Sequence, residues 1–105
     1  MKYNSFAFSH GTQSTVETEI LYNIASARAN KVEILRFSPS QVENEKALSA
    51  AIRVLRGLKK QGKIRLFILS QDLFSDSTEA EYLRNKYPDI SEICDEKEKT
   101  IIVMV

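Results

Sequence analysis

Three short apolar runs, each ending in serine, recur along this chain of 105 residues. Each run is followed by loop-type residues and then by a Ser or Asp placed three residues before a glutamate, the spacing of a helix-capping box. This order predicts a strand, a loop and a helix, repeated three times. The runs are Phe6–Ser9, Ile34–Ser38 and Phe67–Ser70, and the capping pairs are Ser14 with Glu17, Ser40 with Glu43 and Asp76 with Glu79.

The alternation of apolar and helical patterns predicts one α/β domain over residues 1–105. Strands are expected at 3–8, 32–37, 64–69 and 101–105, with a helix in each interval. This order favours a small three-layer sandwich with a four-stranded, mostly parallel, Rossmann-like sheet. Strand order 2-1-3-4 is preferred because Glu33 and Arg36 suit a strand at the sheet edge. An antiparallel last strand, giving an α+β variant, is the alternative.

Composition excludes few function classes. Fifteen basic and fourteen acidic residues nearly cancel, so the net charge neither requires nor excludes a nucleic-acid partner. The single cysteine, Cys94, has no cysteine or histidine cluster around it in sequence, so no metal site is predicted and no cofactor is indicated. No apolar run approaches the roughly 20 residues that span a bilayer. A cytoplasmic protein without a membrane partner is therefore expected.

The loops after the first and third strands form the predicted ligand site. In strand order 2-1-3-4 the order reverses between these strands, where open parallel sheets bind ligands. The first loop combines hydroxyl groups, a glycine and the start of a helix, which favours an anion such as a phosphate-containing or nucleotide-like small molecule. The alternative is that these residues form only a turn and the N-terminal cap of the helix. The candidate ligand-binding residues are Ser9, His10, Gly11, Thr12, Ser14, Thr15, Ser70 and Asp72.

The segment from Phe8 to Thr15 resembles the pyrophosphate loop of the PP-loop ATP pyrophosphatases. That family carries Ser-Gly-Gly-x-Asp-Ser/Thr between its first strand and helix, and Ser9, Gly11 and Ser14 match this pattern. His10 replaces the first glycine, and Gln13 replaces the aspartate. The resemblance covers eight residues and implies a degenerate nucleotide-binding relative.

Two further kinds of chemistry are weaker expectations. His10, the only histidine, could act as a general base, which would make the chain an enzyme. Asp72 and Asp76 could hold a hydrated magnesium ion, although aspartates before a helix are more often caps. Neither pattern has a spacing that is specific for catalysis.

A basic segment supports the alternative function of an interaction module. The residues from Arg53 to Arg65 include six positive charges and no acid. Arg53, Arg56 and Lys60 share one face of the expected second helix, its basic face, opposite the apolar face. They could bind phosphate backbones or an acidic partner, or could simply be a solvated face, which is the favoured interpretation. The predicted interaction residues are Arg53, Arg56, Lys60 and Lys63.

The apolar run at 101–105 suggests assembly. Strand order 2-1-3-4 would place this run on an edge, where exposed apolar strands pair with other chains. A homodimer that covers it is therefore expected. A different order that makes this strand central would remove the need for a dimer.

Overall fold

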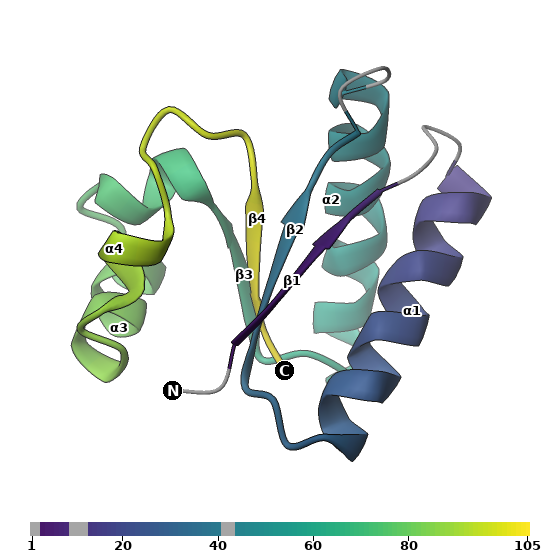
Figure 1. Cartoon of the computed structure of the whole chain (residues 1–105), viewed down its shortest axis with the longest axis horizontal. Coiled ribbons are helices and arrows are strands. Elements are labelled where there is room, and N and C mark those ends of the chain that lie inside the picture. Colours follow the sequence, from purple (N-terminus) through teal and green to yellow (C-terminus); the bar gives the residue numbers. More distant parts are fainter. Residues whose placement is uncertain (1–2, 9–12, 41–43) are drawn as a thin grey trace.

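The computed structural model describes residues 3–8, 13–40 and 44–105, and it contains a four-stranded sheet with helices on both faces (Figure 1). The predicted α/β class is confirmed. The elements in chain order are β1 (Tyr3–Ala7), α1 (Gln13–Ala29), β2 (Ile34–Ser38), α2 (Asn44–Lys60), β3 (Leu66–Leu69), the 3₁₀ helix η1 (Ser70–Phe74), α3 (Thr78–Lys86), α4 (Ile90–Ile93) and β4 (Ile101–Met104).

The sheet has the order β1-β2-β4-β3 and is mixed. β1 and β2 are parallel, whereas β4 is antiparallel to both of its neighbours, β2 and β3. The predicted mostly parallel, Rossmann-like sheet of order 2-1-3-4 is therefore wrong, and the antiparallel last strand is correct. β4 lies inside the sheet, between β2 and β3. All four of its residues are fully buried, as expected of a strand covered on both faces.

The charges near β2 did not indicate a sheet edge, because each has a partner within the fold. Arg36 forms an ion pair with Glu98, which lies in the segment before β4. Glu33 precedes β2 and accepts a hydrogen bond from the Tyr87 hydroxyl at 2.5 Å. These contacts allow β2 to occupy an inner position between β1 and β4.

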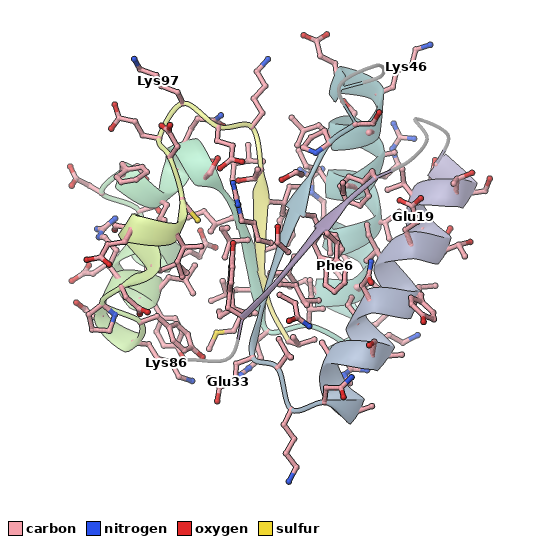
Figure 2. The ribbon with its side chains drawn as sticks, viewed as in Figure 1. Phe6, Glu19, Glu33, Lys46, Lys86 and Lys97 are labelled. Carbon is pink, nitrogen blue, oxygen red and sulfur yellow. The ribbon has the colours of Figure 1, made fainter. Side chains whose placement is uncertain are left out.

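Each face of the sheet has its own core. α1 and α2 cover one face, and Figure 2 shows Phe6 projecting from β1 toward this layer. η1, α3 and α4 lie on the other side, over the half of the sheet that contains β3 and β4. Since side chains alternate along a strand, β4 supplies Ile101 and Val103 to the first core and Ile102 and Met104 to the second.

The two long helices end in the same hydrogen-bonded motif. After α1 the N–H of Val32 donates to the Ala27 carbonyl at 2.8 Å, and after α2 the N–H of Lys63 donates to the Leu58 carbonyl at 3.0 Å. This Schellman motif needs one residue with positive φ. Gly62 fills that position after α2, with a φ of 72°. After α1 the residue is Lys31, with a φ of 56°.

The predicted capping pairs are only partly tested. α1 begins at Gln13, so Ser14 lies inside its first turn and does not cap it. Glu43 lies outside the described residues. α3 is capped by Ser77, whose side chain accepts the Ala80 N–H at 3.2 Å, and not by Asp76.

Candidate functional site

The predicted cleft between the first and third strands does not form. β1 and β3 lie at opposite edges of the sheet, with β2 and β4 between them. Three strand spacings correspond to roughly 14 Å. The carboxyl ends of β1 and β3 are therefore too far apart to share one cleft.

The predicted ligand-binding residues divide accordingly. Ser9, His10, Gly11 and Thr12 lie outside the described residues, so the pyrophosphate-loop resemblance stays a prediction. Ser14 and Thr15 lie in the first turn of α1, which follows β1, whereas Ser70 and Asp72 follow β3 at the opposite edge of the sheet.

Ser70 has a structural role in the fold. Its side chain is fully buried, and its hydroxyl donates to the Glu98 carbonyl and accepts the Thr100 N–H at 3.2 Å. These bonds join the end of β3 to the segment that leads into β4. Asp72, by contrast, is exposed and lines a surface cavity beside β3.

The predicted basic residues are all exposed, but they face different neighbours. The Arg53 guanidinium donates to the Gln13 side-chain carbonyl at 2.8 Å, which links α2 to the start of α1. Arg56 lines the cavity beside β3. The basic face of α2 therefore borders two separate surfaces.

Two adjoining cavities follow the outer edge of β3, and we call them together the edge groove. The larger has a volume of about 350 Å³, and its apolar floor is Phe67, Ile68 and Leu69. The smaller has a volume of about 300 Å³ and continues past Leu66. The walls are Ile52 and Arg56 from α2, Asp72 and Ser75 near η1, and Ser77, Thr78, Glu79 and Tyr82 from α3 and its cap, with Arg65 at the end of the smaller cavity.

The outer side of β3, away from β4, has no strand partner along this groove among the described residues. Among the described residues β3 pairs only with β4. The Ser70 N–H donates to the Thr100 carbonyl at 2.8 Å, and residues facing one partner alternate along an antiparallel strand. Leu66 and Ile68 therefore face β4 as Ser70 does, whereas both backbone groups of Phe67 and the N–H of Leu69 point into the groove. Leu69 is the N-cap of η1, so its C=O accepts the first bond of that helix.

β3 lacks the features that usually protect an edge. Edge strands are commonly blunted by charged residues, proline or bulges. Leu66 to Leu69 contain none of these residue types, whereas β1, the other edge, carries the polar residues Asn4 and Ser5. Of the two edge strands, β3 is thus the one more prone to pair with an additional strand.

One ion pair crosses the open edge, and we call it the edge ion pair. The Lys59 Nζ of α2 lies 3.6 Å from the Glu79 Oε1 of α3. Since α2 and α3 cover opposite faces of the sheet and Glu79 lines the groove beside β3, this contact passes over the outer side of β3. Both side chains are about half exposed, and exposed pairs contribute only about 0–1 kcal/mol. The edge ion pair therefore covers the outer side of β3, and breaking it costs little free energy.

A third cavity, of about 370 Å³, lies where α1 and α2 begin. It is lined by Gln13 of α1 and by Lys46 and Arg53 of α2, with Glu45, Ser49 and Ala50. Figure 2 shows Lys46 at the end of α2 nearest the carboxyl ends of β1 and β2. Two cationic side chains thus lie beside the start of α1, the helix that follows the predicted anion-binding loop.

Other potentially reactive groups do not gather into a site. Cys94 is buried, and burial raises the pKa of its thiol, which favours the unreactive protonated form. Within residues 3–8, 13–40 and 44–105, no group of three or more His, Cys, Asp or Glu side chains is placed to hold a metal ion. No helix in the same ranges has the length and apolar character needed to cross a membrane.

The comparisons with known proteins give no family for this chain. No protein-family model, no curated protein and no solved structure matches it.

Sequence reasoning missed the edge groove because it placed the wrong strands at the edges. β3 is short and wholly apolar, and η1 follows it directly. An apolar run of this kind is also typical of a strand inside the sheet, so it does not distinguish an edge from an inner position. Its position at an edge is what leaves its backbone accessible.

Proposed function

We propose that this chain is a protein-interaction module that binds an extended polypeptide segment by adding it as a fifth strand beside β3. The observation that supports this proposal is the outward-facing backbone of Phe67 and Leu69. It lies in a groove that is bounded by helices on both sides. Strand addition of this kind obtains affinity from main-chain hydrogen bonds and specificity from the flanking pockets.

The walls of the groove define which side chains the added strand would carry. Residues opposite Phe67 and Leu69 would point to the same face as these side chains, toward Ile52 and Arg56 of α2. The residue opposite Ile68 would point toward α3. The floor is apolar on both faces, so we expect alternating apolar residues in the bound segment.

Leu69 offers a variant that blocks the edge with little other effect. Its φ of −74° suits proline, and its N–H points away from β4, so proline removes no bond of the existing sheet. Leu69→Pro should therefore abolish strand addition while the fold persists. Leu69→Ala is the matched control, because it also removes the leucine side chain but keeps the N–H.

The experiment is a selection of phage-displayed random decapeptides on the folded chain, followed by affinity measurement of the enriched peptides. We expect sequences with apolar residues at every second position, which bind the wild type and Leu69→Ala but not Leu69→Pro. No enrichment, or equal binding to the two variants, would overturn the proposal.

A second candidate function is the binding of a phosphate-containing small molecule beside the start of α1. The observation that favours it is the Arg53–Gln13 hydrogen bond, which holds a guanidinium next to that helix terminus. Phosphate, sulfate and nucleotides should then raise the melting temperature, because a ligand that binds only the native state stabilises it. Arg53→Gln should remove the shift, whereas Lys63→Gln should keep it, and no shift with any of these anions would exclude this candidate.

A further inference from the structure

We propose that the segment bound in the edge groove is β3 of a second copy of this chain, running antiparallel to the first. This inference rests on the proposed function, since it names the partner of the same edge. It gives a two-fold symmetric dimer in which two four-stranded sheets become one continuous sheet.

The register follows from the backbone groups that face outward. An antiparallel pair exchanges hydrogen bonds between residues directly opposite each other. If Phe67 of one copy lies opposite Leu69 of the other, both outward-facing residues of each β3 are paired. Ile68 then lies on the two-fold axis, opposite its own equivalent. In this register the Leu69 N–H of each copy donates to the Phe67 C=O of the other. The Phe67 N–H donates to the Leu69 C=O, which is shared with the first turn of η1.

The side chains in this register match each other. The Phe67 and Leu69 side chains of the two copies become cross-strand neighbours on the α2 side of the sheet, and apolar pairs of this kind stabilise sheets. The two Ile68 side chains meet on the α3 side. An apolar edge therefore meets an equally apolar one.

The charges at the ends of the groove also favour a second copy. Arg65 lines the cavity at the start of β3, and Asp72 lines the cavity at its end, and both are exposed. An antiparallel partner brings its Asp72 to the Arg65 end and its Arg65 to the Asp72 end. Each end of the groove thus receives the opposite charge, which is the complementarity that fixes register.

The edge ion pair must separate for the second copy to enter. Lys59 and Glu79 would otherwise occupy the outer side of β3 near the middle of the groove. Glu79→Gln removes the ionic contact while it keeps the side-chain length. We expect this variant to dimerise up to about five times more tightly than the wild type, the factor that corresponds to a weak exposed pair.

The first test is sedimentation equilibrium of the full chain from low micromolar to submillimolar concentration. We expect the wild type and Leu69→Ala to dimerise, and Leu69→Pro to dimerise at least about tenfold more weakly because each copy loses an inter-strand hydrogen bond. Circular dichroism of the three proteins verifies that each is folded. A wild type that is monomeric throughout, or a Leu69→Pro variant that dimerises as well as Leu69→Ala, would overturn the proposal.

The second test uses charge reversal to establish the register. Arg65→Asp and Asp72→Arg should each weaken the dimer, and the double variant should restore it because the exchanged charges again lie opposite each other. Lys60→Asp is the matched control, since Lys60 is exposed on the last turn of α2 and does not line the edge groove. If both single variants weaken the dimer and the double variant does not restore it, the antiparallel register is wrong.

The outcomes separate the dimer from the proposed function. A monomeric wild type that still binds selected decapeptides in a Leu69→Pro-sensitive manner would overturn the second copy as partner and leave strand addition intact. A monomeric wild type that binds none of them would overturn both. Dimerisation that Leu69→Pro does not affect would place the interface elsewhere on the molecule.

Discussion

At the residue scale, the two Schellman motifs place a lysine and a glycine in the same backbone conformation. Lys31 has a φ of 56° and Gly62 a φ of 72°, and only glycine adopts such angles without a steric cost from Cβ. We predict that Lys31→Gly raises the free energy of unfolding by about 0.5–1 kcal/mol and that Gly62→Ala lowers it by about 1 kcal/mol. Urea unfolding measures both, and destabilisation by Lys31→Gly would show that the lysine side chain contributes more than the strain removes.

The Tyr87–Glu33 hydrogen bond makes stability depend on pH in the alkaline range. Burial, and then the bond to Glu33, raise the pKa of Tyr87 from 10.0 to about 12. The folded chain thus holds a proton that the unfolded chain begins to release near pH 10. The contribution of this group to stability is complete below pH 10 and is lost as the pH rises through about 12.

We predict that Tyr87→Phe, which cannot ionise, loses less stability than the wild type between pH 10 and 12. Tyr22→Phe is the matched control, because Tyr22 is 73% exposed and its replacement should leave the pH profile unchanged. Urea unfolding midpoints across this range measure the effect. Parallel profiles for the wild type and Tyr87→Phe would contradict the assignment.

At the element scale, α2 carries a glycine that its packing does not require. A Cβ atom added at Gly57 would meet nothing within 4 Å, and the backbone there is helical. Alanine is favoured over glycine in a helix interior by roughly 0.8–1 kcal/mol. We therefore predict that Gly57→Ala raises the free energy of unfolding by that amount. A neutral or destabilising result, measured by urea unfolding, would indicate that α2 is not a continuous helix at this residue in solution.

The sequence predicts the main helices and strands well, because hydrophobic periodicity reports local geometry. A helix is predicted between the strands at 32–37 and 64–69, and α2 is observed there at Asn44–Lys60. η1 and α4 were not predicted. Both are only a few residues long, and a single helical turn has too few residues to show periodicity.

At the scale of the whole molecule, strand order could not be read from charge alone. Arg36 was taken to indicate an edge, but Glu98, more than sixty residues later, neutralises it within the fold. The apolar run at 101–105 is typical of a central strand, which is where β4 lies. The predicted strand order followed instead from the charged residues at and before β2. Because β4 is central, residues 101–105 do not require a dimer to cover them, and the case for a homodimer rests on β3 instead.

The strand order also decides which candidate sites can exist. It places β1, which precedes Ser14 and Thr15, and β3, which precedes Ser70 and Asp72, at opposite edges of the sheet. It also leaves the outer side of β3 without a strand partner among the described residues. Sequence reasoning did identify Arg56 and Asp72, which line the edge groove, although it assigned them to two different surfaces. The groove itself depends on long-range strand pairing, which no local pattern encodes.

Amide hydrogen exchange along β3, followed by NMR, is the most direct test of strand addition at the open edge. The amides of Ile68 and Ser70 face β4 and should be protected at every protein concentration, whereas those of Phe67 and Leu69 should exchange rapidly in dilute protein. We predict that Phe67 and Leu69 become protected when the protein is concentrated or when a selected decapeptide is added. If their exchange stays unchanged under both conditions, or if they are already as protected as Ile68 in dilute protein, the edge of β3 is not a binding surface.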